Sequence, residues 1–356
     1  LTGEGAIPDY YNYYYDTPWC QSRENIKKII IEEGITNIGS YAFYGCTGLT
    51  EIEIPNSVTS IGNSAFEECS GLTGNLVIPD SLTSIEESVF KGCSSFSGGL
   101  TIPSSITNIG DNTFFYCTNL ISITIPNGVT SIGDLVFEGC EKLATVIIPD
   151  SLLGIGGLAF NRCYSLAEIT LPDGLKSIGT RAFNDCASLT TVTIPASVTS
   201  IGENAFDGCA RLTSINVDEE NTKYSSVDGV LFDENKATLI KFPAKKVDVT
   251  YIIPETVIAI SDAAFYGCES LSSVTMGNGV GSIGAYAFQN CIGLESITLS
   301  DSIKEIGEYV FIGCKSLTSI TFQGTMAQWN EIDFGNRWND EVPAKFVLCT
   351  DGDVQI

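Results

Sequence analysis

Apolar residues recur along this chain in a fixed order, with a period of 23 or 24 residues. In the unit at residues 49–71, Ile52 and Ile54 alternate with two glutamates, which predicts a half-buried β-strand. Pro55 follows directly and removes a backbone donor, so we expect the strand to end there. Each unit therefore begins with a short strand that buries one face.

The second half of the unit has a different pattern. Ile61 and the adjacent Gly62 predict a short extended or tight-turn segment. Ala65, Phe66 and Cys69 have helical spacing, but they are too few for a full helix. We therefore expect a single turn there, of the 3₁₀ type.

Eleven units share a phenylalanine three residues before a cysteine and an isoleucine five residues before that phenylalanine. The cysteines are Cys46, Cys69, Cys93, Cys117, Cys140, Cys163, Cys186, Cys209, Cys268, Cys291 and Cys314. A fixed period of this length is typical of a solenoid, in which each coil stacks its apolar residues on those of the next. Neighbouring strands would then pair in parallel at about 4.8 Å.

The cysteines allow a metal or redox interpretation and a structural one. All eleven occupy one equivalent position, and no Cys-x-x-Cys pair occurs. Stacked coils would make their Cα–Cβ bonds parallel, which suits a disulfide poorly. We therefore expect a column of buried free thiols. Cys20 and Cys349 lie near opposite ends of the chain, and we do not expect them to pair.

These units resemble the leucine-rich repeats of the BspA-like type, found in bacterial surface and secreted proteins, including those of gut commensals. Residues 198–215 (VTSIGENAFDGCARLTSI) and 303–320 (IKEIGEYVFIGCKSLTSI) carry the resemblance, which extends over about 26–322. It implies a curved, right-handed leucine-rich-repeat solenoid of the α/β class, rich in strands and turns. The parallel sheet would line the concave face, and short turns or 3₁₀ segments the convex face.

The same resemblance suggests how the chain is organised. We expect an N-terminal aromatic cap at 1–25, the solenoid at 26–322 and a C-terminal cap at 323–356. The aromatic cluster Tyr10, Tyr11, Tyr13, Tyr14, Tyr15 and Trp19 would cover the open end of the sheet, or alternatively stack on a sugar or protein, and Trp329 and Trp338 would cover the other end. An insertion near 218–248 interrupts the period, and Tyr224–Phe242 predicts a β-hairpin that projects from the solenoid.

The composition excludes some kinds of catalysis and disfavours some classes of partner. The chain of 356 residues has no histidine, which excludes Ser-His-Asp and Cys-His catalysis and disfavours an enzyme. Its net charge of −25 disfavours nucleic acid and anionic membranes as partners. No apolar run reaches the roughly 18 residues of a membrane span. If a signal peptide directs the protein, we expect it to precede Leu1.

Candidate binding residues lie at outward positions of the repeated strands. They are Glu51, Glu53, Thr101, Thr124, Thr170, Thr193, Thr275 and Thr298. Threonine suits an exposed strand through its β-propensity, which is the structural interpretation. The functional interpretation is a hydroxyl-lined face that contacts a glycan or an extended polypeptide.

The resemblance implies a secreted or cell-surface protein that binds or adheres to host or microbial macromolecules without catalysis. The alternative is a structural spacer within a larger surface protein. A glycan-active enzyme is a weaker hypothesis, because it needs two carboxylates about 5–9.5 Å apart in a cleft. We expect a monomer without cofactor or metal. Calcium between Asp150 and Asp173 of successive units is a minor alternative.

Overall fold

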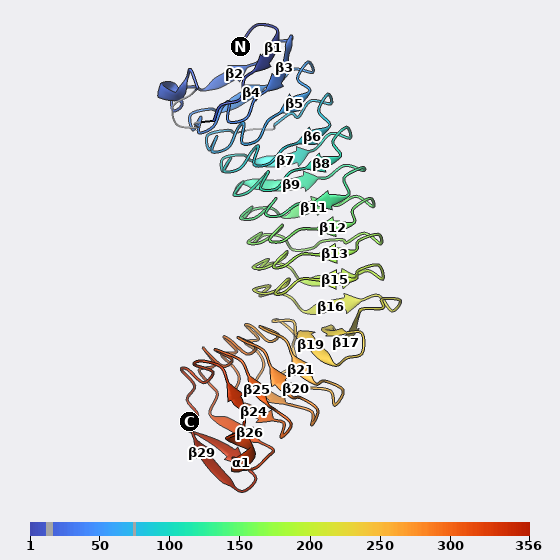
Figure 1. Cartoon of the computed structure of the whole chain (residues 1–356), viewed down its shortest axis with the longest axis vertical. Coiled ribbons are helices and arrows are strands. Elements are labelled where there is room, and N and C mark those ends of the chain that lie inside the picture. Colours follow the sequence, from blue (N-terminus) through green and yellow to red (C-terminus); the bar gives the residue numbers. More distant parts are fainter. Residues whose placement is uncertain (12–16, 74–75) are drawn as a thin grey trace. The chain divides into compact units, whose positions relative to one another are not determined.

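A computed structural model of the chain describes residues 1–11, 17–73 and 76–356. The chain divides into two compact units. The first comprises Leu1–Ser188 and Ser200–Ala205, and the second Leu189–Thr199 and Phe206–Ile356. Each unit is a solenoid of short, mostly parallel strands stacked coil upon coil (Figure 1). Tyr13, Tyr14 and Tyr15 of the predicted aromatic cluster lie outside the described residues.

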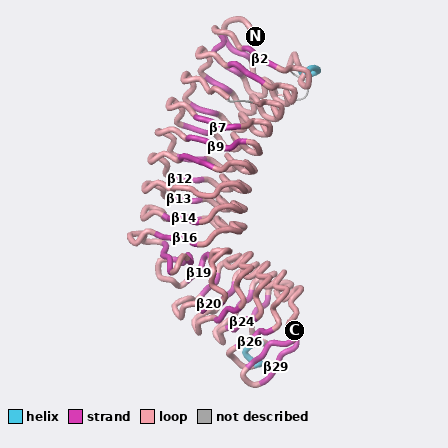
Figure 2. Tube along the Cα trace, turned by 180° about the vertical axis from the view of Figure 1, so that it is seen from behind, coloured by secondary structure: helices cyan, strands magenta, loops and turns pink. Residues whose placement is uncertain are grey.

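Each regular coil can contribute to two columns of strands (Figure 2). The first column contains the predicted Ile-x-Ile strands. In the first unit these are β2 (Lys28–Ile30), β4 (Glu51–Glu53), β7 (Gly98–Thr101), β9 (Leu120–Thr124) and β11 (Thr145–Ile147). In the second unit they are β14 (Thr191–Ile194), β16 (Ser214–Val217), β20 (Thr250–Ile252), β22 (Ser273–Thr275), β24 (Ser296–Leu299) and β26 (Ser319–Phe322), followed by β28 (Phe346–Cys349) and β29 (Gly352–Gln355).

The second column is formed by the segment that ends just before the glycine of the repeat, such as Ser60–Ile61 before Gly62. The sequence predicts an extended or tight-turn segment here. In the first unit it contains β1 (Gly5–Ile7), β3 (Ile35–Ile38), β5 (Ser60–Ile61), β6 (Ser84–Ile85), β8 (Asn108–Ile109), β10 (Ser131–Ile132), β12 (Gly154–Ile155), β13 (Ser177–Ile178) and β15 (Ser200–Ile201). In the second unit it contains β19 (Thr238–Lys241), β21 (Ala259–Ile260), β23 (Ser282–Ile283), β25 (Glu305–Ile306) and β27 (Asp333–Phe334). Paired strands of this column run parallel. Most pairs place isoleucine against isoleucine, as Ile132 with Ile155, whereas β19 contributes Leu239 and β27 contributes Phe334.

After the two strands, each coil continues with consecutive turns, and these turns stack into a third column. The spacing of Ala65, Phe66 and Cys69 predicts a helical turn here, and that prediction is wrong. Leu135 and Gly139 have positive φ angles of 59° and 71°, and an L-residue helix cannot contain this conformation regularly. The amide of Cys140 donates to the carbonyl of Phe137 (3.1 Å) across Gly139, which is the geometry of a type II turn. The amide of Phe137 instead reaches the next coil, at the carbonyl of Ala159 (2.8 Å).

The predicted phenylalanine column is confirmed as core. From Phe43 to Phe183, consecutive rings stack at centroid distances between 5.2 and 5.9 Å. In the second unit, Phe265 stacks on Phe288 at 4.6 Å. These side chains are buried. Every coil buries one such ring, and each ring also packs against the rings of the neighbouring coils. The stabilisation therefore adds up along the stack.

The cysteine column is also confirmed: all eleven side chains are buried, and none of them forms a disulfide. The structure adds a reason for cysteine at this position. The Sγ atom of Cys163 lies 3.2 Å from the carbonyl oxygen of Phe137 in the preceding coil, so the thiol donates a weak hydrogen bond. Cys69, Cys117 and Cys314 repeat this contact. A small apolar side chain that still carries one donor fits the site better than alanine would.

The insertion forms antiparallel strands but does not project, so that part of the prediction is wrong. Strands β17 (Tyr224–Val227) and β18 (Val230–Asp233) form one hairpin, and β18 pairs with β19 to form a second. β19 then pairs in parallel with β21 of the next coil. Phe232 and Phe242 are buried, and the ring of Phe242 stacks on Phe265 at 5.1 Å. Projecting these side chains into water would forfeit their burial.

Aromatic residues continue the core toward both ends of the chain. Trp19 stacks on Phe43 at 5.2 Å and donates from Nε1 to the carbonyl of Ala42, next to a 3₁₀ turn at Cys20–Ser22. At the other end, α1 (Met326–Trp329) begins with a capping box at Thr325, and its buried Trp329 contacts Phe322 edge-on. The cap boundaries at 1–25 and 323–356 remain predictions.

Candidate functional site

The predicted threonine face consists of the outward positions of the first strand column. In the first unit, Thr101 pairs in register with Thr124, and Thr124 with Ile147. Thr101 is exposed and Thr124 is half-buried. Thr170 is exposed but lies outside the assigned strands. The face is therefore hydroxyl-rich over two coils and then becomes apolar, because Ile147 is 55% exposed.

In the second unit the same face is more regular. Thr275, Thr298 and Thr321 stand in register on β22, β24 and β26. A second row of hydroxyls lies beside them, and the Oγ of Ser296 donates to the Oγ of Ser273 (3.1 Å). Thr193 belongs to a separate two-stranded sheet, where it pairs with Asn216. Because every strand is held by backbone hydrogen bonds, the hydroxyls form fixed rows.

Sequence reasoning missed the apolar residues that border these rows. Ile252 of β20 is 74% exposed and pairs with Thr275. Leu348 of β28 pairs with Thr321, and Phe346 of the same strand is also exposed. The alternation of Phe346, Val347 and Leu348 around a buried valine is a strand signal that could have placed them here. Phe346 supplies an aromatic surface at the border of the face.

Glu51 and Glu53 lie together at one end of the first unit, on β4. Both carboxylates contact Lys28 of β2, with Nζ–Oε1 distances of 2.9 and 2.5 Å. Hydrogen bonds to Glu53, and then to Glu51, raise the pKa of Lys28 above its ordinary value. A shared cation gives these carboxylates a structural role, and at this exposure such pairs contribute little to stability.

Burial makes the cysteine column chemically inert. Desolvation raises the pKa of the Cys46 thiol to about 11, and it raises those of Cys69, Cys93 and Cys163 well above the ordinary value. The thiolate is the nucleophile and the metal ligand, so a thiol that stays protonated serves as neither. Within residues 1–11, 17–73 and 76–356, no three Asp, Glu, Cys or His side chains are placed to share a metal ion.

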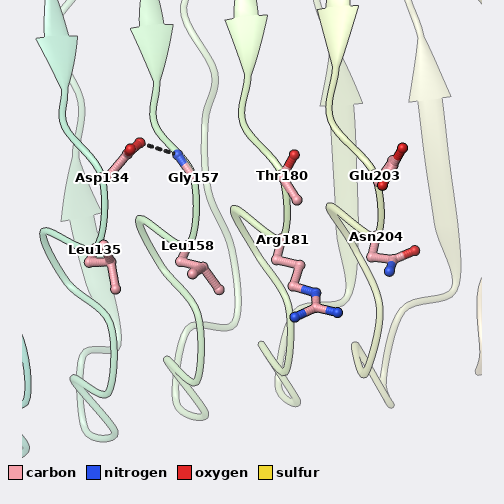
Figure 3. A pocket seen from close by; sticks show the side chains of 8 residues that line it. All are labelled: Asp134, Leu135, Gly157, Leu158, Thr180, Arg181, Glu203 and Asn204. Atoms are coloured by element: carbon pink, nitrogen blue, oxygen red, sulfur yellow. Dashed lines mark hydrogen bonds between the residues drawn. The ribbon is translucent and has the colours of Figure 1, made fainter.

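A shallow groove runs along the corner between the second strand column and the turns in the first unit. Figure 3 shows four successive coils, with Asp134, Gly157, Thr180 and Glu203 on one wall. The volume of the groove is about 230 Å³. The Oδ1 atom of Asp134 accepts the amide of Gly157 (2.6 Å), so this carboxylate ties one coil to the next. The equivalent corner of the second unit is larger, at about 360 Å³.

A buried ion pair lies beneath the insertion in the second unit. The Nζ of Lys241 lies 2.6 Å from Oδ1 of Asp207 and also donates to the carbonyl of Ala263 (2.7 Å). Both residues are buried, and the Lys241 ammonium lies 6.0 Å from the ring centroid of Tyr266. Because both charges are buried and paired with each other, we assign the pair a structural role, which is to position β19.

Comparisons with known proteins agree with this architecture. A family model described as a BspA type leucine rich repeat region matches residues 19–144, 132–251 and 244–339. A solved leucine-rich repeat protein of Bacteroides ovatus ATCC 8483 is 26% identical, with a TM-score of 0.59; the match covers 89% of this chain and 91% of that one. The pneumococcal vaccine antigen PcpA is 21% identical, covering 98% and 78%, with a TM-score of 0.52.

No curated protein matches the chain. In the described part of the chain, no helix combines the length and apolarity that crossing a bilayer requires. The structural similarities confirm the solenoid fold that the repeat predicted, whereas the choice of binding face remains a prediction.

Proposed function

Since this chain belongs to the family of BspA-type leucine-rich repeat proteins, we propose that it is a non-catalytic binding protein, secreted from or displayed on a bacterial cell. The observation that carries the proposal is the threonine face of the second unit. There, three threonines in register and the adjoining serine row lie on backbone-paired strands. Such a face needs no rearrangement to bind a ligand, which reduces the entropic cost of association.

The ligand class that fits this face is an extended glycan or polypeptide. Rows of hydroxyls both donate and accept hydrogen bonds, and they repeat at the spacing of parallel strands, about 4.8 Å. Phe346 and Leu348 at the border add exposed apolar surface, on which a sugar ring or an apolar side chain can pack. The face carries few charges of its own, so we expect binding that depends only weakly on salt.

Retention of the purified chain on immobilised mucin, extracellular-matrix proteins and intact bacteria tests the proposal. We expect retention on at least one of them, and loss of it in Thr298→Trp, which places a bulky ring in the middle of the rows. Thr130→Trp is the matched control, because Thr130 is an exposed threonine of the first unit that precedes a strand of the second column and not of the first. Retention on none of the surfaces would favour the spacer role instead.

A further inference from the structure

The corner groove of the second unit differs from that of the first in its charge. Glycines of three successive coils form its floor, and four carboxylates line it: Asp262, Glu305, Glu308 and Asp333. None of the described residues that line it is a lysine or an arginine. The groove of about 360 Å³ is therefore large enough for a long side chain, and its lining is net negative.

Two of these carboxylates are arranged unfavourably for the isolated protein. Glu305 of β25 and Asp333 of β27 are direct register partners on adjacent parallel strands, and both are exposed. Like charges opposite one another destabilise a sheet. Asp262 has a structural role, because its Oδ1 accepts the amide of Ala285 (2.7 Å). Within the described residues, neither Glu305 nor Asp333 has a side-chain hydrogen bond or ion pair that would explain its position.

An aromatic ladder borders the groove on the turn side. Tyr286 and Tyr309, in successive coils, stack at 5.4 Å with an angle of 6° between their rings. Each follows a groove-lining residue, Ala285 and Glu308 respectively. The guanidinium of Arg337 lies 5.5 Å from the centroid of Tyr309 and pairs with Asp340 through Nε (2.5 Å). The ladder thus already holds one guanidinium between an aromatic ring and a carboxylate.

At the other end of the ladder the hydroxyl of Tyr286 donates to Oε1 of Glu308 (3.5 Å), and no cation among the described residues stacks on its ring. Ala263 occupies the position equivalent to Tyr286 in the preceding coil, so a methyl group stands where the neighbouring coils carry a ring or a guanidinium. Tyr286 is 36% exposed. An arginine side chain laid along the groove would place its guanidinium near this ring and near the unpaired carboxylates, which is favourable cation–π and ion-pair chemistry.

We propose that this groove binds an arginine-bearing, extended segment of a partner protein. The proposal deepens the proposed function and rests on it, because it adds a second binding surface and specifies the chemistry of its partner. The net charge of −25 favours encounter with a basic segment. Carboxylates on adjacent coils, at the strand spacing of about 4.8 Å, are close enough for one guanidinium, with its five donors, to contact both.

The probe is a nonapeptide of alternating arginine and glycine, and its citrulline analogue keeps the shape without the charge. Isothermal titration with the full chain should show binding of the arginine peptide and at least about tenfold weaker binding of the citrulline peptide. Glu305→Gln combined with Asp333→Asn should weaken the arginine peptide about tenfold. The same pair of changes should not lower the unfolding midpoint, because it removes a repulsion.

Two further variants separate the groove from general attraction. Tyr286→Ala should also weaken the arginine peptide, with circular dichroism confirming the fold. Glu141→Gln combined with Glu168→Gln removes the same number of charges from exposed sites on the first unit and should leave binding unchanged. Equal weakening in the groove and control variants, equal binding of the citrulline peptide, or no binding of the arginine peptide would each overturn the proposal. Retention through the threonine face would persist in any of these cases, so the two failures are distinguishable.

Discussion

A glycine stands at the corner of most coils, directly after the isoleucine of the second strand column, and close approach of backbones explains it. A β-carbon on Gly156 would lie 2.6 Å from the backbone carbonyl carbon of Gly133 in the preceding coil. A β-carbon on the neighbouring Gly157 would meet nothing nearer than 3.5 Å. Neither residue has a positive φ, so the two positions differ in space and not in backbone conformation.

Gly156→Ala should therefore lower the free energy of unfolding by about 1–3 kcal/mol, because the adjacent backbone must move. Gly157→Ala should change it by no more than about 0.5 kcal/mol. Two coils place Glu86 and Ser261 at this corner, so a local shift is expected and not loss of the fold. Urea denaturation of both variants checks this, and equal effects at the two positions would contradict the close-approach explanation.

Some features of single residues can be predicted from the sequence and others cannot. The sequence predicts the buried phenylalanines and cysteines correctly, because buried positions recur with the period of the repeat. It does not predict the left-handed residues, because Leu135 and Leu158, at φ angles of 59° and 56°, are types that rarely adopt that conformation. Each donates its amide to a carbonyl of the next coil, Leu135 to Gly157 and Leu158 to Thr180 (2.9 Å each), a contact that the local sequence does not reveal.

Among the elements, the insertion depends on the buried pair of Lys241 and Asp207. A charge buried without its partner costs several kcal/mol, whereas the pair itself is often close to neutral compared with apolar residues. Lys241 is 5% exposed and would keep no carboxylate partner if Asp207 were removed. The stability of β19 in its place should therefore depend on the pairing of the charges more than on either residue.

Asp207→Ala should lower the unfolding free energy of the second unit by about 3–5 kcal/mol. Combining it with Lys241→Met should restore most of that loss, because methionine fills a similar volume without charge. Hydrogen exchange at the amides of β19 and β21 reports the effect locally. If the double variant were as unstable as the single one, the charge pair would not be the cause.

The location of the hairpin could not be decided from the pattern alone. The turn near Asp233–Lys236 was recognisable, but the Asp228–Gly229 turn between β17 and β18 was overlooked, although Asp-Gly between alternating runs is a strong hairpin signal. β19 takes the place of a second-column strand because it pairs with β21, through Thr238↔Ala259 and Leu239↔Ile260. No local feature of the sequence specifies these pairs.

For the molecule as a whole, the buried thiols link stability to pH. Burial raises the pKa of Cys69, Cys93, Cys117 and Cys291 well above the value of an unfolded thiol. As the pH rises past about 8.5–9, the unfolded chain loses these protons while the folded chain keeps them. The unfolded state then binds fewer protons, so stability must fall with rising pH.

We therefore expect the unfolding free energy to be nearly constant between pH 7 and pH 8 and to fall above pH 9, by up to about 1.4 kcal/mol per pH unit for each buried thiol within the cooperatively unfolding unit. Urea titrations between pH 7 and pH 10 measure this. Cys163→Ala should reduce the slope by one thiol's share while lowering stability at pH 7 by about 1–2 kcal/mol. A flat profile to pH 10 would mean that the thiols are not kept protonated by the fold.

The sequence by itself determined the repeat, the strands with one buried face, the phenylalanine and thiol core and the family. It did so because buried positions must be apolar, so their alternation and period can be seen in the sequence. It did not determine the second strand column, the left-handed turns, the incorporation of the hairpin or the corner groove. Those features depend on backbone groups and side chains about 23 residues apart that meet only when coils stack. Glu305 and Asp333 illustrate the difference: they are unremarkable in sequence, and become a paired negative site through the register of β25 and β27.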